Sequence, residues 1–241
     1  MTLLAVDRGN TFTKLGIFSE SILQEAVSVT DSQLETELQG LIKKYSPADA
    51  IFSSVRNDAF DLKKIGGDKL NTLVPTSNSK FPFQIDYQNK ENIGFDRLAN
   101  ACGAVKRFSG KNVLVVDCGT CTTYSLVEDN IFRGGAIAPG ITMRLKALNH
   151  YTGRLPLLER KNELPEIPGQ STEGSIRAGA ELAAILETDA LIERFGNKTA
   201  DLIVLLTGGG MSFFEQHLKS PTFAAPYLTL EGLHEIFVLN K

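Results

Sequence analysis

The sequence predicts an α/β protein made of two duplicated domains, joined near Gly110, with a cleft between them. A short apolar run, an acidic turn containing glycine and a second strand occur near residue 7 and again near residue 117. The two copies also agree at an offset of 110, where Leu4, Val6, Asp7, Gly9 and Thr13 match Leu114, Val116, Asp117, Gly119 and Thr123. The expected domains therefore cover residues 1–109 and 110–241.

In the first domain, apolar runs rich in β-formers alternate with segments of helical spacing. A hairpin is expected around the turn at residues 8–10, and Asp31 is expected to cap the first helix. Proline, asparagine and serine without periodicity predict a long loop over 75–93. The expected elements are strands over 3–6, 11–18, 22–29 and 50–55, a helix over 31–45, a helix and a strand ending near 74, and a helix over 94–108.

The second domain repeats this order. Thr172 is expected to cap its long helix, which follows a proline-containing loop over 161–171. Two glycine-rich strand ends, 134–140 and 207–210, are typical of turns and of places where a backbone approaches a nucleotide closely. The expected elements are strands over 113–116, 122–127 and 202–206, a helix from near Gly140, the long helix over 172–195, and one more helix after Gly210.

Composition excludes several classes of protein. The chain has 241 residues, and its 25 Lys and Arg against 28 Asp and Glu give a net charge of −3. A broad surface for nucleic acid or for an anionic membrane is therefore not expected. The short apolar N-terminus lacks a basic region, and no apolar run approaches the length of a membrane span. With only three cysteines, we expect a cytoplasmic protein with reduced thiols.

The turn from Asp7 to Thr11, with Lys14 after it, has the chemistry of a phosphate site. Gly9 permits a tight turn whose backbone N–H groups can face a phosphate, Lys14 adds a positive charge, and Asp7 can hold Mg²⁺ through water. The alternative is a capped hairpin turn, but a second copy at 117–120 favours phosphate binding from both domains. No P-loop sequence and no G-x-G-x-x-G after the first strand are present.

Cys118 and Cys121 form a C-x-x-C sequence that also occurs in redox and zinc sites. A redox pair normally opens a helix, whereas residues 122–127 are typical of a strand. Zinc requires four ligands, and neither Cys102 nor the three histidines has ligand spacing. An ordinary turn is the favoured interpretation.

Residues 94–97 join the long loop to a helix. Asp96 is a candidate base that accepts a proton from an alcohol, with Arg97 binding an anionic group beside it. In the alternative interpretation, Asp96 only complements the helix dipole and Arg97 is solvated. Tyr87 is either a substrate contact or a packed ring, and the hydroxyl of Thr172 is explained as a helix cap unless the fold brings it to the cleft.

Together these motifs resemble the type III pantothenate kinases of the actin-like ATPase superfamily, over essentially the whole chain. The resemblance depends on Asp7-x-Gly-Asn-Thr-x-x-Lys14, Tyr87, Gly94-x-Asp-Arg97, Asp117-x-Gly-Thr120, the glycine-rich 134–140 segment and Thr172. It implies duplicated ribonuclease H-like domains. It also implies phosphorylation of pantothenate to 4′-phosphopantothenate by ATP with Mg²⁺, the first step toward coenzyme A.

The resemblance further implies a homodimer, with the substrate pocket partly built across the subunit interface. Asp96 would be the proton acceptor, and Asp117 would bind a monovalent cation, K⁺ or NH₄⁺. Lys90 stands where the family usually has proline, and Cys118 and Cys121 where it has small residues without a thiol. ATP would contact Asp7, Arg8, Gly9, Asn10, Thr11, Phe12, Thr13, Lys14 and Thr120, and pantothenate would contact Tyr87, Gly94, Phe95, Asp96, Arg97 and Thr172.

Two other functions remain open at this point. One is a kinase for another small alcohol, or a phosphohydrolase, of the same superfamily. The other is an ATP-binding regulatory protein without catalysis, against which the presence of both Asp96 and Lys14 argues.

Overall fold

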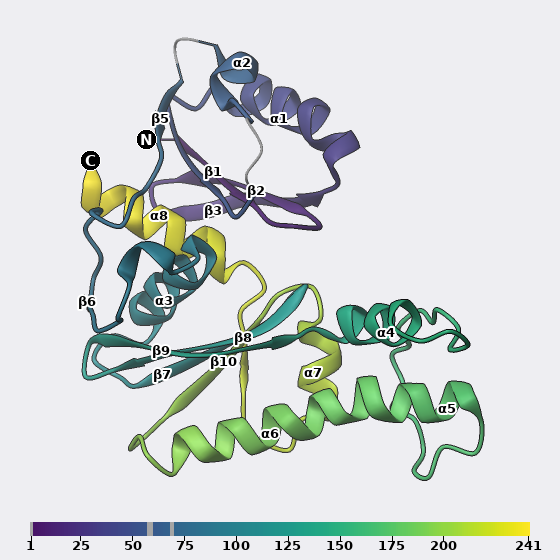
Figure 1. The fold of residues 1–241 in the computed structure, drawn as a ribbon. Helices are drawn as coiled ribbons and strands as arrows, with labels where there is room; N and C mark the ends of the chain where they lie inside the picture. Colours follow the sequence, from purple (N-terminus) through teal and green to yellow (C-terminus); the bar gives the residue numbers. More distant parts are fainter. Residues whose placement is uncertain (1, 57–59, 68–69) are drawn as a thin grey trace. The chain divides into compact units, whose positions relative to one another are not determined.

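A computed structural model describes residues 2–241 of the chain, apart from 57–59 and 68–69. The chain divides into two compact units. The first holds Met1–Gly110, Asn130–Phe132 and Tyr227–Lys241, and the second holds Lys111–Asp129 and Arg133–Pro226. Both units contain a sheet and helices, as Figure 1 shows. Within the described part of the chain, no helix is long and apolar enough to cross a membrane.

The first unit is built on a five-stranded sheet in the order β3-β2-β1-β4-β5. Strand β1 pairs antiparallel with β2 and parallel with β4, and the predicted hairpin is confirmed. The expected loop over 75–93 contains short elements, of which β6 pairs with residues 131 and 132. The elements are β1 (Thr2–Arg8), β2 (Thr13–Ser19), β3 (Ile22–Val29), α1 (Asp31–Tyr45), β4 (Asp49–Ser54), α2 (Leu62–Gly66), β5 (Asn71–Leu73), β6 (Gln84–Ile85), a 3₁₀ turn (Lys90–Asn92), α3 (Phe95–Arg107) and α8 (Leu228–Asn240).

The sheet of the first unit is covered on both faces. Alternate side chains of a strand point to opposite faces, and Leu4 and Val6 pack with Leu38 of α1 in one core. On the other face α8 lies against β1 and β2, where the rings of Phe18 and His234 are 4.7 Å apart. Because both faces are buried, β1 is a continuous apolar run rather than an alternating one.

The start of α1 differs from the prediction that Asp31 caps this helix. Thr30 is the N-cap residue, and its backbone N–H donates to Oε1 of Gln33, 3.2 Å away. Asp31 is the first helical residue, and its carboxylate is paired with Arg56 instead. The prediction was wrong by one position because Thr30 with Gln33 forms a capping box, which satisfies the first turn without Asp31.

The second unit contains strands in the order β11-β10-β7-β8-β9, and β6 lies next to β9 through the residues of β9 that belong to the first unit. A continuous helical stretch runs from 172 to 196, with a π-helical segment in its middle. The elements are β7 (Val113–Cys118), β8 (Cys121–Glu128), β9 (Ile131–Pro139), α4 (Ile141–His150), α5 (Thr172–Arg177), the π-helical segment (Ala178–Leu182), α6 (Ala183–Gly196), β10 (Ile203–Thr207), α7 (Met211–His217) and β11 (Phe223–Ala224).

The duplication is visible in the strand topology. The order β3-β2-β1-β4-β5 recurs as β9-β8-β7-β10-β11, with the central strand antiparallel to one neighbour and parallel to the other in each unit. The backbone N–H of Gly9 donates to the carbonyl of Phe12 at 3.1 Å, and that of Gly119 donates to the carbonyl of Cys121 at 3.0 Å. Each unit therefore closes its first hairpin in the same way.

One residue match at the constant offset was wrong. Thr13 lies opposite Arg8 across β1 and β2, whereas Thr122 lies opposite Cys118 across β7 and β8. The second turn is one residue shorter than the first, so Thr122 is the counterpart of Thr13 by register, rather than Thr123. An alignment of the two repeats at a constant offset of 110 residues does not account for such a deletion.

The C-terminal segment differs from the expected organisation in two ways. Two helices follow Gly210 where one was expected, and the second, α8, belongs to the first unit, whereas the expected domain over 110–241 would include it in the second. Figure 1 shows α8 (yellow) beside α3 (teal). A Cβ at Gly232 would overlap the carbonyl oxygen of Ala99, so the small residue allows the two helices to approach closely.

Candidate functional site

The first hairpin places three polar side chains in one row at the ends of their strands. Asp7 on β1 lies opposite Lys14 on β2 and beside Ser53 on β4, so all three are on the same face of the sheet. Asp7 and Ser53 are buried, at 6% and 3% exposure. Arg8 points to the other face, where its guanidinium carbon lies 4.5 Å from the centroid of the Phe60 ring. The row has the charges needed for a phosphate with its counterion.

The rest of the predicted phosphate segment forms or flanks the turn. Asn10, Thr11 and Phe12 are exposed, and Phe12 keeps 51% of its surface in contact with solvent. Thr13 is buried, and within the described part of the chain its hydroxyl has no hydrogen-bond partner. Residues 10–12 of the turn are thus exposed to solvent, whereas the strands on either side are held by their pairing in the sheet.

Lys14 is connected to α3 through α8. Its ammonium donates to the hydroxyl of Thr229, 3.4 Å away, and that hydroxyl donates to Oδ1 of Asn100 at 2.8 Å. Asn100 and Thr229 are each 1% exposed. Asn100 follows Asp96 by one helical turn on α3, so this chain of side chains joins the first hairpin to the helix that carries the candidate base. Sequence reasoning missed Thr229 and Asn100, because no local motif marks either residue.

Asp96 and Arg97 lie in the first turn of α3, whose N-cap residue is Gly94. The carboxylate of Asp96 accepts a hydrogen bond from the backbone N–H of Arg97 at 2.8 Å. A Cβ at Gly94 would overlap the same carboxylate, so glycine leaves room for the Asp96 side chain to fold back over the helix start. This terminus favours a negative charge, and Phe95 precedes the carboxylate at a half-buried position.

The structure brings Arg97 and Tyr87 to the same aromatic ring. The guanidinium carbon of Arg97 lies 5.6 Å from the centroid of Phe132, and the ring of Tyr87 lies 6.3 Å from it. Arg97 is buried, whereas Tyr87 keeps 36% of its surface exposed. Phe132 was not predicted as part of the site, since it stands in an ordinary strand sequence.

In the second unit, both glycine-rich segments meet at the turn that carries Asp117 and Thr120. The backbone N–H of Gly140 donates to the carbonyl of Thr120 at 3.1 Å, and that of Gly210 donates to the carbonyl of Cys118 at 2.8 Å. A Cβ at Gly208 would overlap the carboxylate of Asp117. Glycine at these positions therefore lets three backbone segments converge around one carboxylate.

The two cysteines of this turn have different surroundings. Cys118 is buried at the end of β7, and burial raises the pKa of its thiol well above its ordinary value, which keeps it protonated and unreactive. Cys121 is half-buried and begins β8, so a strand follows the C-x-x-C sequence as predicted. This geometry lacks the helix that activates a redox thiol.

Thr172 does not cap the long helix, contrary to the prediction. Ser171 is the N-cap residue, and its hydroxyl accepts a hydrogen bond from the backbone N–H of Gly174 at 3.0 Å. Thr172 is the first residue of α5 and is exposed. Its hydroxyl is therefore not used as a cap, which leaves the alternative role as a substrate contact open.

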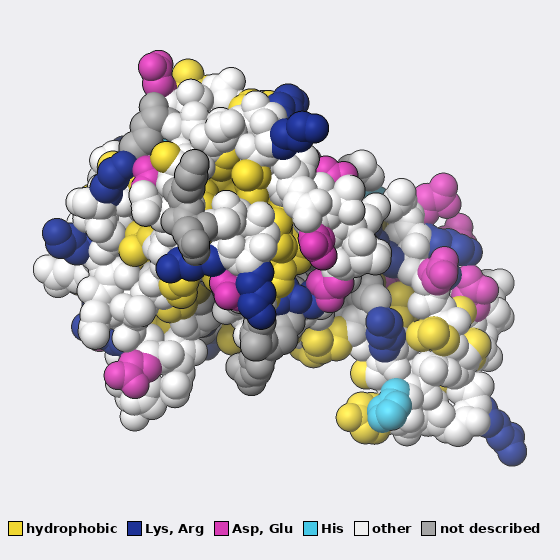
Figure 2. All heavy atoms as spheres, turned by 90° about the horizontal axis from the view of Figure 1, so that it is seen from above, with side chains coloured by type: hydrophobic (Ala, Val, Ile, Leu, Met, Phe, Trp, Pro, Cys, Tyr) yellow, Lys and Arg dark blue, Asp and Glu magenta, His cyan; other side chains and the backbone are white. Residues whose placement is uncertain are grey.

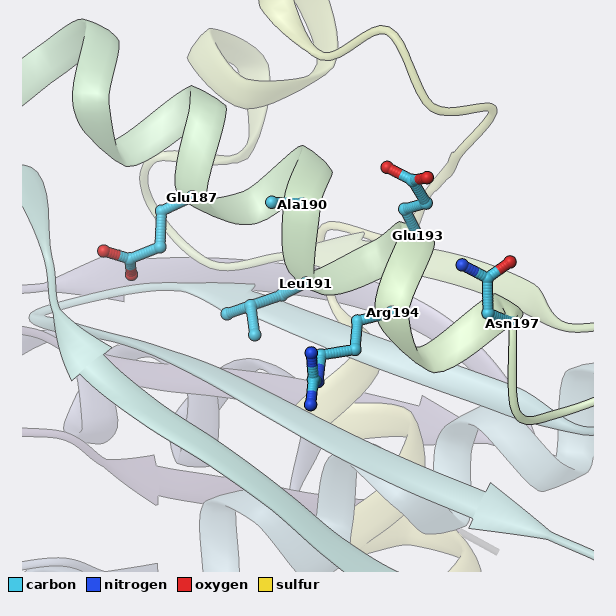
Figure 3. A pocket seen from close by; sticks show the side chains of 6 residues that line it. All are labelled: Glu187, Ala190, Leu191, Glu193, Arg194 and Asn197. Atoms are coloured by element: carbon cyan, nitrogen blue, oxygen red, sulfur yellow. The ribbon is translucent and has the colours of Figure 1, made fainter.

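A hollow of about 460 Å³ lies along α6 in the second unit (Figure 3). Glu187, Leu191 and Arg194 share one face of that helix, and Glu187 is already paired with Arg144 at 2.8 Å. The hollow is formed by one helix and contains no residue of the predicted site. Its lining residues are Glu187, Ala190, Leu191, Glu193, Arg194 and Asn197.

Figure 2 shows Lys and Arg side chains interspersed with Asp and Glu on the face in view. This mixture follows from the nearly balanced counts of 25 basic and 28 acidic residues. The face in view therefore carries no broad basic surface of the kind that binds polyanions.

Comparison with known proteins gives a consistent result. A family model described as type III pantothenate kinase matches residues 3–194. The type III pantothenate kinase of Cytophaga hutchinsonii is 38% identical over 242 residues, covering 98% of this chain and 99% of the relative. That of Bacteroides fragilis strain YCH46 is 37% identical over 244 residues, covering 99% and 98%.

Solved structures of lower identity share the fold. A Baf family transcriptional activator from Campylobacter jejuni has a TM-score of 0.65 at 20% identity, covering 98% of this chain and 97% of its own. Component A of the (R)-2-hydroxyglutaryl-CoA dehydratase of Acidaminococcus fermentans has a TM-score of 0.58 at 14% identity, covering 100% of both chains. The predicted fold class is confirmed as two duplicated α/β units of the ribonuclease H-like fold.

Proposed function

Because the chain belongs to the type III pantothenate kinase family, we propose that it phosphorylates pantothenate with ATP and that Asp96 accepts the proton of the reacting hydroxyl. The activity is a step of coenzyme A biosynthesis. The observation that carries the assignment to Asp96 is its place in the first unit, on the helix that Asn100 and Thr229 connect to Lys14. A base and a phosphate-binding lysine are thereby held by one rigid network.

The proposed reaction is a direct transfer of the γ-phosphoryl group from ATP to pantothenate. The primary hydroxyl oxygen of pantothenate forms a bond to the γ-phosphorus, and the bond from that phosphorus to the bridging oxygen of ADP breaks. Asp96 takes the hydroxyl proton, and 4′-phosphopantothenate and ADP leave. Phosphoryl transfer requires mainly positioning and electrostatic stabilisation, so Lys14 and the backbone N–H groups of the turn carry the charge of the transferred group.

We assign the ATP phosphates to the turn of the first hairpin, with contacts from Asp7, Gly9, Asn10, Thr11, Phe12 and Lys14. The side chains of Arg8 and Thr13 lie on the other face of the sheet, so these two residues would support the turn rather than contact the phosphates. A buried carboxylate oxygen suits Mg²⁺, which prefers oxygen ligands and keeps several waters. Asp7, buried at the end of β1, therefore fits this ion, which would neutralise phosphate charge when it is bound.

In the second unit we assign Thr120 to ATP and Asp117 to a monovalent cation, K⁺ or NH₄⁺. The convergence of three backbone segments around the Asp117 carboxylate supports this assignment. A cation there would offset the negative charge of ATP near this carboxylate.

Pantothenate is also an anion, and we assign its carboxylate to Arg97. The shared packing of Arg97 and Tyr87 on Phe132 supports a common substrate surface, to which Gly94 and Phe95 contribute through the start of α3. Thr172 is proposed as a further contact, with its hydroxyl not used as a cap. We also propose a cytoplasmic homodimer.

A coupled assay of ADP release with pantothenate tests the function. We expect turnover in the presence of Mg²⁺ and K⁺, and a fall in kcat of about 100-fold or more for Asp96→Asn, with the KM for ATP little changed. Asp129→Asn is the control, since Asp129 is an exposed acid in the turn between β8 and β9.

Other outcomes would identify a different function. Full activity of Asp96→Asn would overturn the role of that residue. ADP release independent of any alcohol would indicate a phosphohydrolase, and turnover only with another alcohol would indicate a different kinase. Binding of ATP without turnover would indicate a regulatory protein.

A further inference from the structure

Arg56, two residues beyond the end of β4, makes three close polar contacts with segments far from it in the sequence. Its Nε donates to the carbonyl oxygen of Gly9 at 2.7 Å, and its Nη2 donates to that of Asn10 at 3.0 Å. Its Nη1 donates to Oδ2 of Asp31 at 2.6 Å. The side chain is only 15% exposed. One guanidinium therefore holds two consecutive carbonyls of the hairpin turn and is itself held by the start of α1.

These contacts determine the orientation of two peptide groups. In a trans peptide the C=O and the N–H point in opposite directions. The carbonyls of Gly9 and Asn10 point toward Arg56, so the N–H groups of the same peptides, which belong to Asn10 and Thr11, point away from it. Consecutive N–H groups directed to one side are the geometry by which a turn binds an anion.

The neighbouring contacts fix the base of the same turn. The N–H of Gly9 donates to the carbonyl of Phe12, and the N–H of Val55 donates to the carbonyl of Arg8, both at 3.1 Å. Arg8 also approaches Asp31, with an Nη2 to Oδ1 distance of 3.9 Å. The hydrogen bond from Arg56 lowers the pKa of Asp31, which keeps its carboxylate charged beside the two arginines. The carbonyl side of the turn is thus held by a charged cluster.

We propose that Arg56 is a positioning residue for the phosphate-binding turn, acting through the carbonyls of Gly9 and Asn10, and that Asp31 fixes its orientation. This inference rests on the proposed function, in which the turn binds the phosphates of ATP. The ligand class is a nucleoside di- or triphosphate. Without Arg56, the turn has to be ordered by the ligand itself, and that ordering lowers affinity.

A lysine substitution distinguishes a positioning role of Arg56 from an effect of its positive charge alone. Lysine keeps the charge of Arg56 but lacks the planar fork that reaches two carbonyls at once. Arg56→Lys is therefore expected to resemble Arg56→Met rather than the wild type. An arginine that acted on the phosphates only through its charge would be replaced well by lysine.

The test combines steady-state kinetics with ADP binding measured by calorimetry. Arg56 makes charge-assisted hydrogen bonds to both carbonyls, and the loss of such bonds is expected to weaken nucleotide binding about 10-fold, which corresponds to about 1.4 kcal/mol. We expect Arg56→Met and Arg56→Lys to raise the KM for ATP and the Kd for ADP about 10-fold, with the KM for pantothenate within about twofold of the wild type. Asp31→Asn is expected to raise the same two constants by a smaller factor.

Arg107→Met is the matched control. Arg107 donates to both carboxylate oxygens of Glu231 at 2.7 and 2.6 Å, so its loss also removes a paired guanidinium of the first unit, although not one in contact with the turn. We expect ATP and ADP constants close to the wild type for this variant. The unfolding midpoint of every variant is measured alongside.

The two proposals fail in different ways. Wild-type turnover of pantothenate tests the function, whereas the dependence of ADP affinity on Arg56 tests the inference. Unchanged ADP affinity in Arg56→Met, or recovery of it in Arg56→Lys, would overturn the inference. A parallel rise in both KM values with a lower unfolding midpoint would show a purely structural role and would also overturn it. If Arg56→Met does not fold, Arg56→Lys and Asp31→Asn decide the outcome.

Discussion

Lys14 has a defined position because its long side chain ends in a fixed network. A lysine ammonium on a flexible stem carries about 2 kcal/mol of rotamer entropy, which a ligand has to overcome when it orders the side chain. Thr229 accepts a hydrogen bond from Lys14 and donates one to Asn100, so its single hydroxyl orients both partners. The network therefore orders the lysine in part before any ligand binds.

Replacing Thr229 tests this role of the hydroxyl. Thr229→Val keeps the shape of the side chain but leaves the buried amide of Asn100 without this donor. We expect the free energy of unfolding to fall by about 1–3 kcal/mol, and kcat/KM for ATP to fall about 5- to 10-fold, which corresponds to about 1–1.4 kcal/mol. Urea denaturation and kinetics with varied ATP measure the two effects. Thr229→Ser restores the hydroxyl and is expected to recover both, whereas a serine variant as impaired as the valine variant would contradict the prediction.

At the scale of elements, hydrophobic periodicity predicted the helices and strands in which buried side chains recur at regular spacing along the chain. The spacing of Leu34, Leu38 and Leu41 identified α1, because one face of that helix is buried. Helix α8 gave no such signal for its place in the fold, since buried side chains surround most of it. The element against which such a helix packs depends on the shapes of the two surfaces. Gly232 contacts Ala99 of α3, and these two residues lie far apart in the sequence.

Two glycines in helices are expected to respond oppositely to alanine. A Cβ at Gly232 would overlap the backbone of α3, so Gly232→Ala forces α8 away and is expected to destabilise the protein by about 1–3 kcal/mol. A Cβ at Gly40 in α1 would meet nothing within 4 Å, so Gly40→Ala is expected to stabilise by about 0.5–1 kcal/mol. Thermal and urea unfolding compare them. A neutral Gly232→Ala would mean that the packing of α8 on α3 tolerates expansion.

At the scale of the whole molecule, the repeat was predictable because two short motifs start equivalent strands. Asp7 and Asp117 both stand near the end of the first strand of their unit, and the strand order around them is the same. The path of the chain was less predictable, because it returns to the first unit at Tyr227 after completing the second. A domain boundary placed from the sequence assumes that each domain is one continuous segment. An apolar C-terminal helix instead packs against whichever hydrophobic core is incomplete without it.

This path predicts the effect of ending the chain at Pro226. The truncation removes α8, and the five buried apolar side chains of this helix contribute about 7.5–15 kcal/mol, at about 1.5–3 kcal/mol each. This quantity is comparable with the whole stability of a domain. We expect limited proteolysis to degrade residues 1–110 rapidly while a resistant fragment remains within 111–226. Val238→Ala is the control, because that side chain on α8 is 52% exposed. A first unit as resistant as in the full chain would show that its core is complete without Leu228, Leu230, Leu233, Ile236 and Phe237.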